Sequence, residues 1–193
     1  MRYPSGINKN YTKEIKYDNR GMNLEGDLNL TNLYYLNNNI ASIYKKPTPI
    51  KLVKVDYPSR KEAKITEAYF MTPSTTDYNG IYKGKYIDFE AKETAGTSFP
   101  LENIHSHQIK HLNTIYDMGG IGFIIVYFSK YNSIYLLTIE KFNEFTTNNK
   151  RKSIPLEYFK KNGYLINYKY NPRIDYLKII DDIYFKEEVW KRK

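Results

Sequence analysis

Residues 87–92, with the sequence Ile-Asp-Phe-Glu-Ala-Lys, alternate strictly between apolar and charged side chains. This period of two is typical of a β-strand with one buried face and one polar face. Asp88, Glu90 and Lys92 would share the polar face, so the strand would present two carboxylates and an ammonium group side by side. Residues 78–86, which come just before, predict a short strand, a turn and the start of the next strand. We therefore expect a β-hairpin in this part of the chain.

Asp77 stands directly before the predicted hairpin, which would bring it back beside Glu90. Two carboxylates and a lysine at a sheet edge suit metal-assisted hydrolysis of a phosphodiester. Carboxylate oxygens are ligands for Mg²⁺, and an ammonium group can stabilise the charge that builds on the phosphate. A Glu-x-Lys pair on a strand is also a common solvent-facing ion pair, so the pattern alone leaves both interpretations open. Asp88 is a second-rank candidate, either as a ligand or as the charge partner of Lys92.

The charge balance of the chain favours a polyanionic partner. Its 193 residues include 30 Lys and Arg against 21 Asp and Glu, which gives a formal net charge of +9. Nucleic acid is the first candidate for such a basic chain, although many basic proteins do not bind it. The 21 Tyr and 9 Phe include residues that could stack on bases. The length predicts one domain with a real core rather than two.

Several other chemistries find no support in the sequence. The absence of cysteine excludes a thiol nucleophile, a disulfide framework and a cysteine zinc site. There is neither a G-x-S-x-G elbow nor a glycine-rich phosphate loop. His107 and His111 are four residues apart, but no third soft ligand is evident, which favours surface histidines over a metal site. The N-terminus lacks a signal-peptide pattern and the longest apolar run, 121–128, is too short to span a bilayer, so we expect a soluble cytoplasmic protein with no membrane partner.

The pattern of the chain predicts one mixed α/β domain over residues 1–193. Residues 1–17 are polar and basic and are expected to form a flexible arm. Helical spacing predicts a helix over 22–36, and strands are expected over 40–45 and 50–55. Residues 56–73 are charged and show no clear period. We expect this segment to protrude from the domain as an insertion.

Two further helix residues are candidates for the site. Glu25 lies in the first predicted helix, either as a solvated surface acid or as a second-rank site residue. A second helix is expected from Pro100 to Tyr116, and Gln108 interrupts its apolar stripe. That glutamine is either satisfied inside the core or directed at a site. Strands are expected over 121–128 and 133–139, and short helices near 155–161 and 174–185.

Over about residues 1–145 the chain resembles the RecU-type Holliday junction resolvases. The segments that carry the resemblance are Asn19-Arg20-Gly21-Met22, Lys45-Lys46-Pro47-Thr48-Pro49, Val55-Asp56-Tyr57-Pro58, Glu67-Ala68-Tyr69-Phe70, residues 73–80 (Pro-Ser-Thr-Thr-Asp-Tyr-Asn-Gly), residues 86–94 (Tyr-Ile-Asp-Phe-Glu-Ala-Lys-Glu-Thr), Thr97-Ser98-Phe99-Pro100 and His107-Gln108. The loop after Thr94 is about one residue shorter than is usual in that family.

The resemblance implies a restriction-endonuclease-like core, with a central mixed sheet flanked by helices, in a mushroom-shaped homodimer. It places Thr75, Asp77, Glu90 and Gln108 at Mg²⁺-site positions, where Mn²⁺ is expected to substitute, and makes Lys92 the positive group at the transition state. The 56–73 insertion matches the family's stalk, which meets the centre of the junction. The residues expected to contact DNA are Arg20, Arg60, Lys61, Lys64 and Phe70.

The expected activity is the Mg²⁺-dependent resolution of four-way junctions by paired, symmetric nicks, in homologous recombination and DNA repair. Two alternatives stay open at this point. One is a recombination accessory factor that binds junctions without cleaving them. The other is a nuclease with the same core that acts on ordinary duplex DNA or on RNA. A recombinase or the branch-migration machinery is an open candidate for a protein partner.

Overall fold

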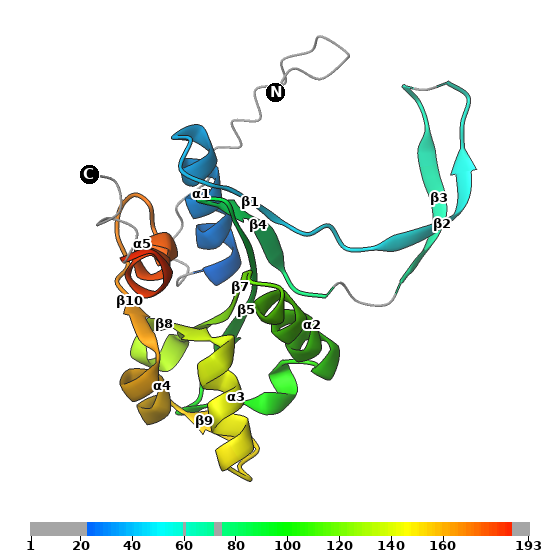
Figure 1. Ribbon diagram of the computed structural model, residues 1–193. Coiled ribbons are helices and arrows are strands. Elements are labelled where there is room, and N and C mark those ends of the chain that lie inside the picture. Colours follow the sequence, from blue (N-terminus) through cyan, green and yellow to red (C-terminus); the bar gives the residue numbers. More distant parts are fainter. Residues whose placement is uncertain (1–22, 60, 72–74, 187–193) are drawn as a thin grey trace.

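The computed structural model describes residues 23–59, 61–71 and 75–186 (Figure 1). Its centre is a six-stranded sheet with the order β1-β4-β5-β7-β8-β10. The strands are β1 Ser42–Lys45, β4 Tyr78–Tyr82, β5 Lys85–Thr94, β7 Ile121–Phe128, β8 Ser133–Thr138 and β10 Tyr164–Ile166. β5 and β7 run parallel, and the other neighbouring strands pair antiparallel. The predicted mixed α+β fold with a central mixed sheet is therefore confirmed.

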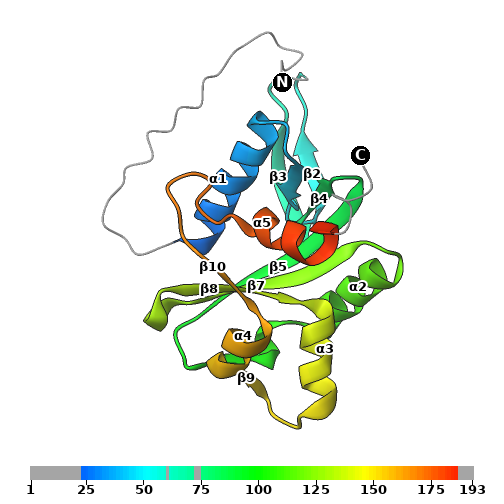
Figure 2. The ribbon, with the colours of Figure 1, turned by 60° about the vertical axis from the view of Figure 1, so that its left-hand side comes forward.

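Helices cover both faces of the sheet, as Figure 2 shows. α1 (Leu24–Asn37) and α5 (Tyr176–Ile180) pack on one face. α2 (Ser106–Asp117), α3 (Ile139–Asn148) and α4 (Leu156–Asn162) contribute to the core on the other. β7 lies between these two layers with all its residues buried, which explains its continuous apolar sequence.

The second helix begins later than the sequence predicts. A single helix was expected from Pro100 to Tyr116, but residues 101–103 form a 3₁₀ turn and α2 starts at Ser106. His105 precedes the helix in an extended conformation, and its backbone N–H donates to Oε1 of Gln108 at 3.0 Å. This reciprocal capping arrangement starts the helix at this point because it satisfies backbone groups that otherwise lack a partner. The same loop carries β6 (Ser98–Pro100), which pairs with β9 (Ser153–Pro155).

A two-stranded hairpin protrudes from the domain between β1 and β4 (Figure 1). It consists of β2 (Ile50–Asp56) and β3 (Lys64–Phe70), which pair with each other and with no strand of the central sheet. Every residue of both strands is exposed. The protrusion therefore begins at Ile50, before the insertion predicted over 56–73. The reason is that β2 forms one strand of the protruding hairpin and does not belong to the core.

The first helix and the C-terminal helical segment lie where the sequence predicts them. α1 and β1 agree closely with the predicted helix and strand, and a π-helical turn over 181–185 continues α5 as the pattern near 174–185 predicts. The predicted arm over 1–17 lies outside the described residues. None of the described helices combines the length and the apolar character that crossing a membrane would need.

Candidate active site

The β4–β5 hairpin places Asp77 next to Glu90, as the sequence predicts. Tyr78 pairs with Phe89 in the register of the two strands, so Asp77 and Glu90 are the next opposed positions. The backbone N–H of Asp77 donates to Oε2 of Glu90 at 3.1 Å. The side chain of Asp77 in turn accepts a 3.2 Å hydrogen bond from the backbone N–H of Ala91. These two bonds fix both carboxylates at the same end of the hairpin.

Glu90 is fully buried, and its only cationic neighbour among the described residues is Lys92. The ammonium Nζ of Lys92 lies 2.6 Å from Oε1 of Glu90. Burial, and next the negative charge of Asp77, raise the pKa of Glu90 from 4.5 to about 7, although Lys92 opposes the shift. A carboxyl group with a pKa raised in this way is frequent at catalytic and metal-binding positions.

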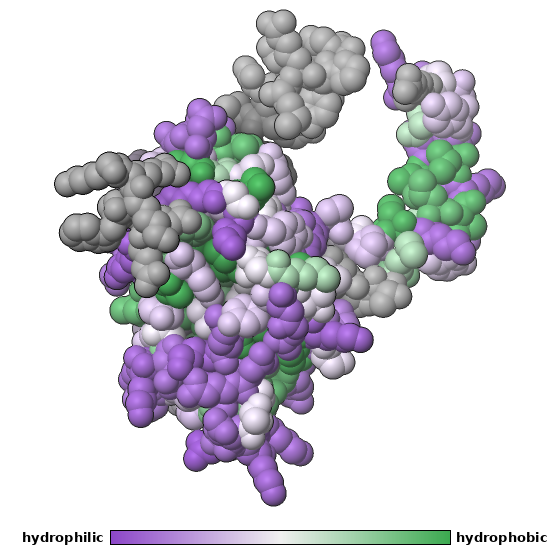
Figure 3. Space-filling model, viewed as in Figure 1, coloured by the Kyte–Doolittle hydropathy of each residue, from purple (hydrophilic) through white to green (hydrophobic). Residues whose placement is uncertain are grey.

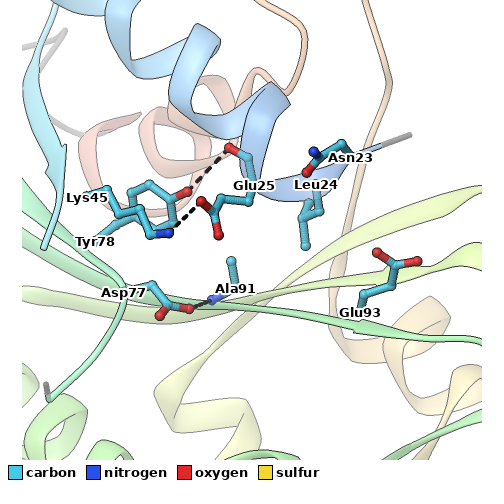
Figure 4. Close-up of a pocket in the computed structure, with 8 residues that line it drawn as sticks. All are labelled: Asn23, Leu24, Glu25, Lys45, Asp77, Tyr78, Ala91 and Glu93. Carbon is cyan, nitrogen blue, oxygen red and sulfur yellow. Dashed lines mark hydrogen bonds and ion pairs between the residues drawn. The ribbon is translucent and has the colours of Figure 1, made fainter. Parts of the chain in front are cut away.

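Asp77 opens onto a cleft of about 180 Å³ between the start of α1 and the edge of the sheet (Figure 4). Glu25 lines the same cleft and makes a 2.5 Å ion pair with Lys45. Glu93 lies further along its wall. The second-rank candidate Glu25 is thus close to Asp77, but its charge is already partnered by the lysine.

Asp88 has a different environment from Glu90, although both lie on one face of β5. Its carboxylate is fully buried and makes a 2.9 Å ion pair with Lys46. Oδ2 also lies 3.1 Å from the hydroxyl of Tyr86 and 3.0 Å from Nε2 of His111. Asp88 is therefore the centre of a polar network. Of the two alternatives for Asp88, the structure does not show the charge pair with Lys92, because Lys92 pairs with Glu90 and Asp88 with Lys46.

The structure places Thr75 and Gln108 in contacts of their own. The hydroxyl of Thr75 accepts a 2.9 Å hydrogen bond from Lys46. Gln108 is buried, and its side-chain oxygen accepts the capping bond from His105. The anomalous glutamine is thus satisfied at the start of α2. The role of Gln108 at a metal, which the family resemblance implies, remains a prediction. The hydrogen bond from His105 occupies the same oxygen that a metal would bind.

The donor set of the hairpin fits a hard divalent cation. No group of three or more Asp, Glu or His side chains that could hold a metal gathers within the described part of the chain. Mg²⁺, however, is usually held by one or two carboxylates together with water and substrate phosphate. Asp77 and Glu90 supply such a pair, and Oε1 of Glu90 is a buried oxygen that already lies beside one cation, the ammonium of Lys92. An oxygen of this kind favours a cation as its partner.

The residues expected to contact DNA gather on the protruding hairpin. Lys61 lies in its turn and Lys64 at the start of β3, and both are exposed. Phe70 is 83% exposed, so it does not pack the base of the protrusion in this chain. Arg20 and Arg60 lie outside the described residues. Figure 3 shows that apolar surface also gathers on this hairpin.

Sequence reasoning missed two side chains of the polar network, Lys46 and His111. The side chain of His111 is 24% exposed, so it is not the plain surface histidine that the spacing favoured. The i, i+4 spacing of His107 and His111 carried no information on Asp88, which is 23 residues away in sequence. No local pattern indicates Lys46 either, because its partners lie on other strands and loops.

Comparison with known proteins finds one family over most of the chain. The sequence model of the family described as Recombination protein U matches residues 19–182. The chain is 51% identical over 198 residues to a Holliday junction resolvase RecU of Bacillus cytotoxicus, covering 96% of this chain and 98% of the relative. It is 50% identical over 197 residues to a protein of the same name from Bacillus cereus, with the same coverage. A solved structure of the Holliday junction resolvase Hjc of Archaeoglobus fulgidus is similar with a TM-score of 0.45 and 11% identity, over 74% of this chain and 93% of that chain.

Proposed function

This chain belongs to the Recombination protein U family, and we propose that it is a structure-selective DNA endonuclease that resolves four-way Holliday junctions. Its relatives at about half identity carry the name Holliday junction resolvase. The observation that carries the proposal is the convergence of Asp77, Glu90 and Lys92 at one end of the β4–β5 hairpin. This is the combination of hard oxygen ligands and fixed positive charge that phosphodiester hydrolysis requires.

In this proposal Asp77 and Glu90 hold Mg²⁺, with Thr75 and Gln108 as supporting positions and Mn²⁺ as a substitute. The bound ion would lower the pKa of a water nucleophile and neutralise charge on the scissile phosphate and the leaving oxygen. Lys92 contributes a positive charge that the strand already fixes beside the carboxylates. Because Glu90 is buried with a raised pKa, its ionised form gains more from a cation than an exposed glutamate would.

The proposed active species is a homodimer. The described part of one chain offers one such site, whereas resolution of a four-way junction needs cuts in two strands of like polarity. Two sites related by a two-fold axis match the near-symmetry of the junction. Paired nicks then follow from geometry, without a second kind of site in the same chain.

The protruding hairpin is the proposed reader of junction shape. Its register places Ile50 opposite Phe70 and Leu52 opposite Ala68, so one face of the hairpin is apolar at its base, before the irregular pairing that follows Leu52. An exposed apolar face on an otherwise unsupported two-stranded hairpin indicates an interaction surface. Lysines lie along the same hairpin, which favours a polyanion over a basic or neutral partner. They are Lys51, Lys54, Lys61 and Lys64. We assign the junction centre, where stacking between bases is interrupted, to this surface.

The proposed setting is homologous recombination and DNA repair in the cytoplasm. Phosphate contacts from the basic surface would supply most of the affinity, and the shape of the junction would supply selectivity. The net charge of +9 is consistent with this division.

The experiment is cleavage of a four-way junction labelled on each strand in turn, in Mg²⁺, beside a linear duplex of the same sequence. We expect paired products from opposite strands of the junction and little cleavage of the duplex. Asp77→Asn is the matched control, because it keeps the size of the side chain and removes its charge. Binding of the junction without any product would favour the accessory-factor alternative, and equal cleavage of the duplex would favour a general nuclease.

A further inference from the structure

Lys46 joins four residues of the site through its backbone and side chain. Its backbone N–H donates to the carbonyl oxygen of Asp77 at 2.8 Å. Its ammonium group donates to the hydroxyls of Thr75 at 2.9 Å and Thr76 at 2.6 Å. The same ammonium lies 2.9 Å from Oδ2 of Asp88. One residue therefore holds both ends of the segment 75–77 and ties it to β5.

The ammonium of Lys46 has no remaining donor for DNA. A lysine ammonium carries three N–H donors and no acceptor. Thr75, Thr76 and Asp88 take all three, and the side chain is only 13% exposed. Lys51, near the base of the hairpin, is exposed and can reach solvent. Lys46 is thus placed to hold neighbouring segments together and not to contact a phosphate.

The charge arrangement on β5 explains why a lysine is needed at this position. Asp88 and Glu90 are both fully buried on one face of the strand, where like charges raise each other's energy. Each has its own cation, because Lys46 pairs with Asp88 and Lys92 pairs with Glu90. Separate partners leave Lys92 beside the proposed metal ligands while Lys46 is committed to Asp88 and the two threonines.

The position of Lys46 also links the site to the protruding hairpin. It directly follows β1 and precedes the connection over 47–49 that leads into β2. Its partners, residues 75–77, lie on the connection that returns from β3 to β4. Lys46 therefore ties the two connections together at the base of the hairpin.

We propose that Lys46, paired with Asp88, is a positioning residue that holds the Thr75–Asp77 segment against β5, so that the carboxylate of Asp77 stays in place beside Glu90. This inference rests on the proposed function, since it concerns the geometry of that site. The competing explanation is that the pair only neutralises a buried charge and keeps the domain folded. The two explanations differ in what remains when both charges are removed together.

The test is the double variant Lys46→Met/Asp88→Asn, which leaves the net charge unchanged and no buried charge without a partner. The melting temperature and the affinity for the junction in Ca²⁺ should stay close to those of the parent chain. The kcat for junction cleavage in Mn²⁺ should fall roughly 100-fold with KM little changed, because a small displacement of a catalytic group has effects of that size. Mn²⁺ binding, titrated by calorimetry without DNA, should weaken roughly 10-fold. Parental kcat and parental Mn²⁺ affinity in the double variant would overturn the proposal.

Two further variants keep the test decisive. Lys46→Arg retains the charge, but a planar guanidinium cannot direct one nitrogen to the same three acceptors. If the double variant does not fold, Lys46→Arg decides: a reduced kcat at parental melting temperature supports positioning, and parental kcat rejects it. Lys160→Met is the control for loss of one positive charge, since Lys160 makes only a surface pair with Glu157. A parent chain that cleaves no junction would refute the proposed function, whereas the DNA-free Mn²⁺ titration would still test the role of Lys46.

Discussion

The backbone N–H of Asp77 donates a 3.1 Å hydrogen bond to Oε2 of Glu90, so the two carboxylates meet at one end of the β4–β5 hairpin. This contact has an electrostatic consequence. The negative charge of Asp77 adds to the effect of burial and raises the pKa of Glu90 to about 7. A site of this kind is strained when both groups are ionised, and a cation between them relieves the strain. The energetic cost of ionising Glu90 can be measured from the free energy of unfolding, and the effect of a cation from the melting temperature.

Catalysis should be separable from DNA binding. Asp77→Asn, Glu90→Gln and Lys92→Ala should each reduce junction cleavage by roughly a hundredfold or more, the usual size of loss when charge stabilisation at a transition state is removed. Junction affinity in Ca²⁺ should persist, because it is spread over many phosphate contacts. The measurement is a cleavage time course beside a gel-shift titration at one salt concentration. Full activity of Glu90→Gln in Mg²⁺ would contradict the site.

Glu90→Gln should stabilise the metal-free domain at alkaline pH. A carboxyl group with a raised pKa in the folded state destabilises the fold increasingly as the pH rises from the unfolded pKa, 4.5, to the folded pKa, about 7, and fully above it. A shift from 4.5 to about 7 corresponds to roughly 3 kcal/mol in the free energy of unfolding. We expect the variant to gain up to that amount at pH 8, and the gain to shrink as the pH falls from 7 toward 4.5.

Urea unfolding at several pH values, in the presence of EDTA, measures this difference. The control is Glu157→Gln, which alters a surface glutamate of α4 paired only with Lys160. It should change the free energy of unfolding by no more than about 0.5 kcal/mol at any of these pH values. A Glu90→Gln variant that is less stable than the parent at pH 8 would mean that the Lys92 ion pair outweighs the burial of the carboxylate.

Metal dependence should follow the preference of oxygen ligands. Mg²⁺ or Mn²⁺ should support cleavage, because the proposed ligands Asp77 and Glu90 are carboxylates. Ca²⁺ should permit junction binding with little turnover, since it is larger and less strict in geometry. Mn²⁺ should also raise the melting temperature of the parent chain but not that of Asp77→Asn. Undiminished cleavage in excess EDTA would rule out this mechanism.

Local pattern was sufficient to predict the core of the site, because a strand imposes its period on its side chains. The alternation over residues 87–92 placed Glu90 and Lys92 on one face, and the turn before it returned the chain to Asp77. The structure brings these three side chains together as that pattern predicts. Their chemical role is a further step, which the variants above test.

Other features depend on contacts that no local pattern contains. Lys46 meets Asp88 across 42 residues of sequence, so only the folded chain brings the two charges together. The alternation around Ile50 and Leu52 is typical of a strand with a buried face, yet every residue of β2 is exposed and no described element packs over the strand. The oxygen of Gln108 is used at the start of α2, and this use was hidden because the helix was expected to begin at Pro100.

Assembly gives a prediction that is independent of chemistry. The species that resolves junctions should be a symmetric dimer, because two cuts need two copies of the site. Light scattering of the full chain, at the concentration used for cleavage, should give a mass near twice 22.9 kDa. A preparation that contains only monomer and still yields paired products would contradict the proposed arrangement.

Phe70 should contribute to junction selectivity rather than to stability. Its side chain is 83% exposed at the end of β3, opposite Ile50, and lies beside the lysines of the hairpin. Phe70→Ala should lower the ratio of junction affinity to duplex affinity, because stacking of a base on an aromatic ring contributes about 1–3 kcal/mol. The melting temperature should hardly change, whereas truncation of a buried aromatic costs about 3–5 kcal/mol. Tyr170→Ala is the matched control, since Tyr170 is 98% exposed and lies away from the hairpin, and it should alter neither quantity. A large fall in melting temperature with an unchanged affinity ratio would place Phe70 in a packed interface and remove it from the DNA surface.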